Sequence, residues 1–130
     1  MNAVFDEIKK FLKNQDIKFK ISDNDDMLYL PYTVNNINTD VFITFSNNVI
    51  MLIFNIQSSK DIHWCNQFNL KHIIPRASRN ETNKNIILDC IYDLNIFPKD
   101  YIEKWFRTAL FVCLDTVKEN FTQSKKDSLS

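Results

Sequence analysis

The chain contains no glycine in its 130 residues, and this absence limits the backbone shapes that it can form. Glycine adopts positive φ angles without steric cost and lets a backbone approach a phosphate group closely. Phosphate-binding loops, dinucleotide-binding turns and the nucleophile turn of α/β-hydrolases all require it. The enzyme families that are recognised by these motifs are therefore excluded, and a binding or structural role is favoured.

The composition predicts a single globular domain without a charge-driven partner. The chain is 45% hydrophobic and contains eleven Phe, which is enough apolar surface to form a core at this length. Sixteen basic side chains balance sixteen acidic ones, so the formal net charge is zero. Because no basic excess is available to neutralise phosphates, we expect no nucleic-acid partner.

The sequence also favours a cytoplasmic location. Residues 1–14 carry Asp6 and Glu7 and lack the apolar stretch of a signal peptide. The longest apolar run, Val49–Phe54, is too short to span a bilayer, so we expect no membrane association. The odd number of cysteines and their wide spacing are typical of buried, reduced thiols. These cysteines are Cys65, Cys90 and Cys113.

Three segments have the apolar spacing of helices. The first spans residues 2–14, with Asn2 as its cap. A short helix is expected to start at Ser58 or Ser59 and to continue to about Asn69. The third begins at Pro98, which suits the first position of a helix, and runs to Phe121. Its apolar stripe consists of Ile102, Phe106, Ala109, Leu110, Cys113, Val117 and Phe121.

Between these helices the apolar residues alternate with a period of two, as in strands. The expected strands cover residues 17–21, Met27–Val34, Val41–Phe45, Val49–Ile56, Ile73–Ile74 and Asn85–Leu94. Asn-rich turns are expected over residues 22–26, 35–40 and 46–48, because Asn tolerates positive φ angles. Residues 76–84 are predicted to be a loop. The strand Val49–Ile56 is apolar on both faces from Val49 to Phe54, so we place it centrally in the sheet, covered by helices.

This order predicts an α+β fold. A mostly antiparallel sheet is expected to carry the N-terminal, the short middle and the long C-terminal helix on one face. Residues 1–121 are expected to form one domain, and residues 122–130 a polar C-terminal tail.

The order of elements resembles the YbjN family of bacterial proteins, whose fold is shared with type III secretion chaperones. The similarity extends from the N-terminal helix through the hairpin Val41–Ile56 and the long strand Ile86–Leu94 to the Pro98-initiated helix. The segment Trp64–Asn69 resembles the apolar-Asn segment of that family, with Asn66 or Asn69 as the asparagine. The resemblance implies a secretion-chaperone-like fold, a regulatory or stress-related role, homodimerisation and binding to segments of other proteins. It implies no active site.

The C-terminal helix provides the candidate site. Tyr101, Trp105, Thr108 and Val112 form a second stripe beside the core stripe, and Phe111 and Leu114 extend it around most of the helix. A helix that is apolar on all sides is usually buried on more than one side. Either the domain core covers both sides, or one side contacts a partner. Trp and Tyr dominate binding hot spots, and we therefore expect partner contacts at four residues. They are Tyr101, Trp105, Phe111 and, outside this helix, Trp64.

Few residues point to catalysis or to a metal ion. His63, Cys65 and His72 are the one group of suitable types, but a helix places His63 and Cys65 on different sides. Asp89 and Asp93 are expected to share one face of a strand, as its polar part. We therefore predict no metal, no cofactor and no catalytic residue.

Three functions follow in order of preference. The first is a non-catalytic, cytosolic, homodimeric module that binds an apolar segment of a partner protein with a sheet edge or helix face. The second is a small immunity or antitoxin protein that binds one specific toxin. The third is an enzyme that uses His63, Cys65 and His72.

Overall fold

The computed structural model describes residues 3–24 and 26–121, so the predicted Asn2 cap and the polar tail at 122–130 lie outside the described residues. The elements follow one another as α1 (Ala3–Asn14), β1 (Lys20–Ile21), β2 (Met27–Val34), β3 (Ile37–Ser46), β4 (Val49–Ile56), α2 (Ile62–Lys71), β5 (Arg76–Arg79), β6 (Ile86–Asp93), the 3₁₀ turn η1 (Lys99–Tyr101) and α3 (Ile102–Asn120). The fold is α+β, as predicted.

The six strands form one sheet in the order β1-β2-β3-β4-β6-β5, and every neighbouring pair is antiparallel. Strands β2, β3 and β4 are joined by two-residue turns at Asn35-Asn36 and Asn47-Asn48. All four asparagines have φ between 53° and 65°. Two successive positive φ angles are the geometry that matches the twist of a hairpin, and here Asn supplies it in place of Gly.

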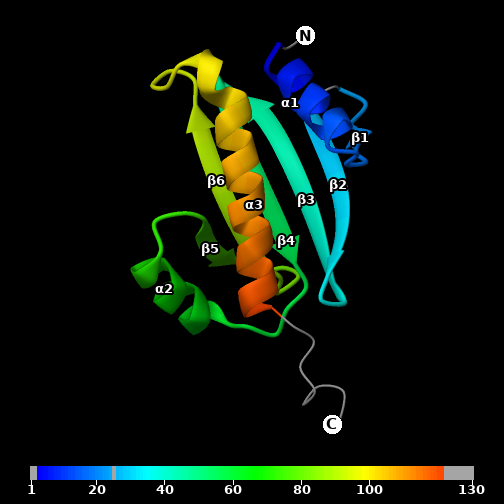
Figure 1. The fold of residues 1–130 in the computed structure, drawn as a ribbon. Coiled ribbons are helices and arrows are strands. Elements are labelled where there is room, and N and C mark those ends of the chain that lie inside the picture. Colours follow the sequence, from blue (N-terminus) through cyan, green and yellow to red (C-terminus); the bar gives the residue numbers. More distant parts are fainter. Residues whose placement is uncertain (1–2, 25, 122–130) are drawn as a thin grey trace.

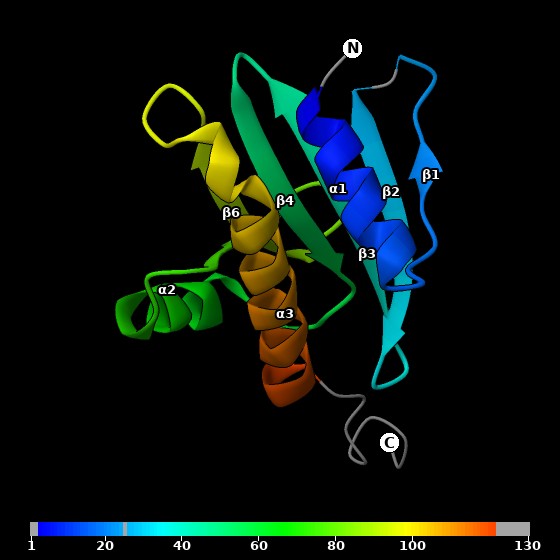
Figure 2. The same ribbon diagram turned by 45° about the horizontal axis from the view of Figure 1, so that its top comes forward.

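Helices α1 and α3 lie on the same face of the sheet, while α2 lies beside β5 at one edge (Figures 1 and 2). The hydrophobic core fills the space between these helices and the sheet. The ring of Phe11 on α1 contacts the ring of Phe106 on α3 edge-to-face, with 5.7 Å between centroids. Helices from the two ends of the chain therefore pack against each other in the core.

Several boundaries differ from the predicted ones. Helix α2 starts after Asp61, whose carboxylate accepts a hydrogen bond of 3.0 Å from the backbone N–H of Trp64, and not after Ser58 or Ser59. Helix α3 starts at Ile102, because η1 intervenes after Pro98. The expected turn at residues 35–40 is shorter, since Ile37–Asp40 already pairs with β2. Of the strand expected at residues 17–21, only β1 pairs.

The region around Pro75 was predicted wrongly. Ile73 and Ile74 are exposed and form no strand, whereas the polar segment Arg76–Arg79, predicted to be a loop, is β5. Only Ala77 of this strand is buried. Pairing with β6 holds the segment in place, and local hydrophobic alternation does not reveal such pairing.

Strand β4 lies in the centre of the sheet, between β3 and β6, as predicted. However, the helices cover only one of its two apolar faces (Figure 2). This arrangement leaves the second face of the sheet uncovered by any described helix, and that face is the candidate functional site.

Candidate functional site

The face of the sheet opposite α1 and α3, called the open face below, is unusually apolar. The strand register identifies the side chains on this face, because residues that pair across neighbouring strands point to the same side of the sheet. Its apolar members are Met27, Tyr29, Pro31, Phe42, Val49, Met51, Ile53, Ile87 and Ile91. An antiparallel sheet with one solvated face normally carries polar residues there. A large exposed apolar patch instead marks an interaction site.

Two cross-strand rows form the centre of the open face. In the first, Tyr29, Phe42 and Ile53 are direct register partners, and the rings of Tyr29 and Phe42 lie 5.3 Å apart between centroids. In the second, Met51 lies between Thr44 and Ile91. Ile91 is 52% exposed. Apolar side chains from four strands thus meet on this face.

Polar groups interrupt this surface at defined points. The hydroxyl of Tyr29 donates a hydrogen bond of 2.7 Å to Asp40, and this bond, together with partial burial and the negative charge, raises the pKa of Tyr29. Asp89 is the register partner of Arg76. Partial burial raises the pKa of Asp89, and the nearby Arg76 guanidinium opposes that effect. The buried Oδ1 atom of Asn55 has no hydrogen-bond partner within the described residues.

A polar hollow of about 210 Å³ lies at the end of the open face and is lined by Asn38, Asp40, Asn55, Gln57 and Asn85. Its lining offers amides and one carboxylate, without a nucleophile or a histidine. It therefore provides hydrogen-bonding groups at the border of an apolar surface, which is the usual anatomy of a protein interface.

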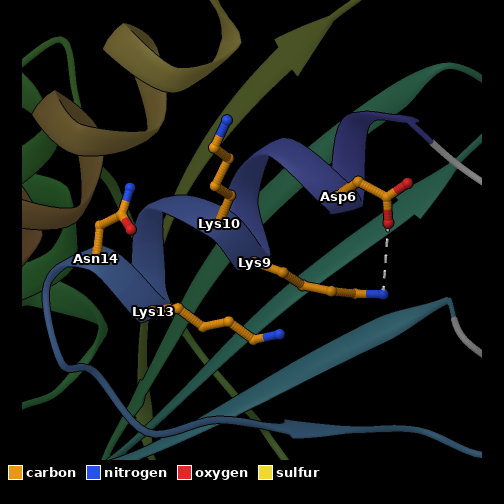
Figure 3. A pocket seen from close by; sticks show the side chains of 5 residues that line it. All are labelled: Asp6, Lys9, Lys10, Lys13 and Asn14. Carbon is orange, nitrogen blue, oxygen red and sulfur yellow. Dashed lines mark ion pairs between the residues drawn. The ribbon is translucent and has the colours of Figure 1, made fainter.

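A second hollow, of about 270 Å³, lies on α1 and is lined by Asp6, Lys9, Lys10, Lys13 and Asn14 (Figure 3). Lys9 and Asp6 form an ion pair of 3.8 Å across it. The hollow carries more positive than negative charge in a chain that is neutral overall.

The four predicted contact residues fall into two groups. Tyr101 and Phe111 are exposed, at 58% and 42%, and remain candidates for partner contact. Trp105 and Trp64 are half-buried against the core. The ring of Trp105 lies 5.3 Å from Tyr92, and that of Trp64 lies 5.0 Å from Phe121. None of the four lies on the open face, which sequence reasoning missed.

One signal in the sequence did point to the open face. The apolar residues on both faces of β4 predict that both faces are covered, by helices of the same chain, but the helices cover only one of them. Because inner and outer residues of β4 have the same chemical character, the pattern does not tell which face the helices leave open. The two carboxylates Asp89 and Asp93 do share this face, as predicted.

The residues considered for catalysis differ in their burial. His63 and His72 are exposed, whereas Cys65 is fully buried. The His72 ring stacks on Phe68 at 4.1 Å between centroids. Among the described residues, no group of three His, Cys, Asp or Glu side chains is placed to hold a metal ion. The sulfurs of Cys90 and Cys113 lie 3.7 Å apart, and all three cysteines are free and buried.

No helix in residues 3–24 and 26–121 is long and apolar enough to cross a membrane. Comparison of the sequence with protein-family models and with curated proteins, and of the fold with solved structures, finds no match.

Proposed function

We propose that this chain is a non-catalytic, cytoplasmic protein-binding module of the YbjN and secretion-chaperone type, which binds protein through its open sheet face and forms a homodimer. The observation that supports the proposal is the row of apolar side chains on a face that no described helix covers. Burial of apolar surface drives most protein association, at about 25 cal/mol per Å².

The open face is large enough for a specific interface. Strands β2, β4 and β6 each contain eight residues. With about 3.3 Å per residue and about 4.8 Å between strands, the four central strands cover roughly 500 Å². Side-chain relief and the edge strands extend this area toward the roughly 800 Å² per partner of a standard interface.

The charges on the face suit a second copy of the same chain. Lys20 and Arg76 stand on the two edge strands, and Asp40, Asp89 and Asp93 stand between them. A two-fold dimer places each surface against an identical one, so a face that carries both signs can match itself. The zero net charge means that two copies do not repel each other at long range.

Sedimentation equilibrium over a wide concentration range tests this proposal. The variant is Ile91→Lys, which places a charge on the exposed centre of the open face near Asp89 and Asp93. The matched control is Ile73→Lys, because Ile73 is 91% exposed and lies outside the sheet. Circular dichroism verifies that both variants keep the fold.

We expect a wild-type dimer whose dissociation constant rises at least tenfold in Ile91→Lys and stays unchanged in Ile73→Lys. A dimer that Ile91→Lys leaves intact would contradict the use of the open face. A wild-type monomer at every concentration would contradict the homodimer and would favour the antitoxin type of function, in which one dedicated partner covers the face.

A further inference from the structure

A groove of about 540 Å³ lies at the β1 edge of the sheet, apart from the central rows of the open face. Lys13 at the end of α1, residues 17–20 and Pro31 on β2 line it. Strand β1 pairs with β2 only at Leu28 and Tyr29, so from Leu30 onward β2 is paired with β3 alone and has no described strand along its other edge. The groove therefore runs beside the outer edge of β2.

The lining of the groove is apolar between its charged groups. Ile17 and Phe19 are half-buried and pack against the core, which holds them in place. Pro31 is exposed and has no backbone N–H. These three side chains form the apolar part of the lining.

Three lysines border this surface. Lys13, Lys18 and Lys20 are exposed, and within the described part of the chain none of them forms an ion pair. The hollow of Figure 3 adjoins the groove through the shared Lys13 and adds Lys9 and Lys10. Together the two hollows are lined by five lysines and one carboxylate, that of Asp6.

We propose that this groove binds an acidic segment of a partner protein in which carboxylates alternate with apolar residues. In an extended segment successive side chains point to opposite sides. The apolar side chains of the bound segment contact Ile17, Phe19 and Pro31, and its carboxylates lie near the lysines. The groove shares Lys20 and Pro31 with the border of the open face, but Lys13 and Lys18 lie outside the strands of the sheet. A failure of this proposal at those two lysines would therefore leave the homodimer proposal untouched.

Fluorescence anisotropy with labelled peptides tests the proposal on the full chain. The probe is a peptide of about eight residues that alternates Glu with Leu, so that in an extended chain the two kinds of side chain point to opposite sides. One control peptide replaces each Glu with Gln, and another replaces each Leu with Ser. The protein variant is Lys13→Gln/Lys18→Gln.

The matched protein control is Lys71→Gln/Lys104→Gln. It removes the same charge from exposed positions, and Lys71 occupies the last turn of α2 as Lys13 occupies that of α1. Helix α2 lies at the opposite edge of the sheet. Any non-specific effect of net charge is therefore equal in the two double variants.

We expect the Glu-Leu peptide to bind about tenfold more weakly to Lys13→Gln/Lys18→Gln than to the wild type, and equally well to the control variant. Both control peptides should bind at least fivefold more weakly than the Glu-Leu peptide. Binding should also weaken with salt, because the Debye length falls from about 10 Å at 0.1 M to about 3 Å at 1 M.

Equal binding to the wild type and to Lys13→Gln/Lys18→Gln would overturn the proposal, and so would equal binding of the Gln-Leu peptide. Binding to anionic phosphatidylserine vesicles without binding to the Glu-Leu peptide would overturn it in favour of a lipid surface. Sedimentation equilibrium of Lys13→Gln/Lys18→Gln distinguishes a loss of peptide binding from a loss of dimerisation, because the dimer should persist in that variant.

Discussion

The side-chain amide of Asn69 forms two hydrogen bonds with the backbone of Ala77: its Nδ2 donates to the Ala77 carbonyl, and its Oδ1 accepts from the Ala77 N–H, both at 2.8 Å. Asn69 belongs to α2, and Ala77 belongs to β5 at the edge of the sheet. The amide thus occupies the position that a further strand would take. It connects α2 to the sheet, and it pairs the N–H and C=O groups of Ala77 that would otherwise be free to bind a strand of another chain.

Replacement of Asn69 by Ala should detach α2 from β5. The change leaves two part-buried backbone groups without partners, so we expect it to lower the free energy of unfolding by about 1–3 kcal/mol. Hydrogen exchange should accelerate first in α2 and β5. Asn66→Ala is the control, since Asn66 is exposed on the same helix. Equal stability of the two variants in urea would contradict this role.

Replacement of Asn36 by Gly should stabilise the chain. Asn36 has φ 65°, and Asn-Gly is the preferred pair for this type of hairpin turn. We expect a gain of about 0.5 kcal/mol for Asn36→Gly and a loss of about 1 kcal/mol for Asn36→Ala, because a Cβ atom is unfavourable at positive φ. Thermal unfolding measures both. A glycine variant less stable than the alanine variant would contradict the turn geometry.

Replacement of Trp105 by Ala should weaken the fold itself. The ring centroid of Trp105 lies 5.3 Å from that of Tyr92 and 6.4 Å from that of Phe106, and the Trp105 side chain is half-buried. We expect a loss of about 2–4 kcal/mol in urea unfolding. Phe111→Ala, at a position 42% exposed, should cost less than about 1 kcal/mol. If Trp105→Ala kept full stability and lost only dimerisation, Trp105 would instead be a contact residue, as the sequence predicted.

The pair Tyr29 and Asp40 should be visible in an alkaline titration. Because the hydrogen bond to Asp40 raises the pKa of Tyr29 above the ordinary value of 10.0, the folded state holds the phenol proton more tightly than the unfolded state. The resulting stability is complete below that ordinary value and is lost as the pH rises through the folded pKa. Phenolate absorbance of Asp40→Ala should show one tyrosine that ionises at lower pH than in the wild type. Tyr29→Phe identifies that tyrosine, and an unchanged titration in Asp40→Ala would contradict the bond.

The three cysteines should resist modification in the folded chain. Burial raises the pKa of Cys65, and the hydrogen bond with Cys90 together with burial raises that of Cys113. The same hydrogen bond lowers the pKa of Cys90, so the protection of this thiol depends on its burial alone. Since the thiolate is the reactive form, a disulfide reagent at mildly alkaline pH should label the native protein slowly and the urea-unfolded protein fully. A thiol that reacts rapidly in the native protein would contradict its burial.

Local patterns were sufficient for much of the fold. The prediction of Met27–Val34 as a strand matches β2 residue for residue, and Val49–Ile56 matches β4. Val4, Phe5, Ile8, Phe11 and Leu12 form the buried side of α1. In each case the spacing of apolar residues is a local property that determines both the element and its inner side.

Elements held by distant contacts were predicted less well. Strand β5 has one buried residue, and its place depends on pairing with β6 and on the amide of Asn69. In the sequence, Asn69 stands out only through the family resemblance of the segment Trp64–Asn69. Its hydrogen bonds join α2 to a strand eight positions later in the chain, and no local periodicity encodes such a contact.

The sequence by itself determined that the chain is an α+β domain, that asparagines replace glycine in its hairpin turns, and that β4 is apolar on both sides. The tertiary structure decided which side of β4 the helices cover, and it placed Trp105 and Trp64 against the core while Ile91, Phe42 and Tyr29 stand on the open face. The physical reason is that burial depends on where distant elements pack. A side chain suited to the core is equally suited to an interface, so composition alone does not distinguish the two.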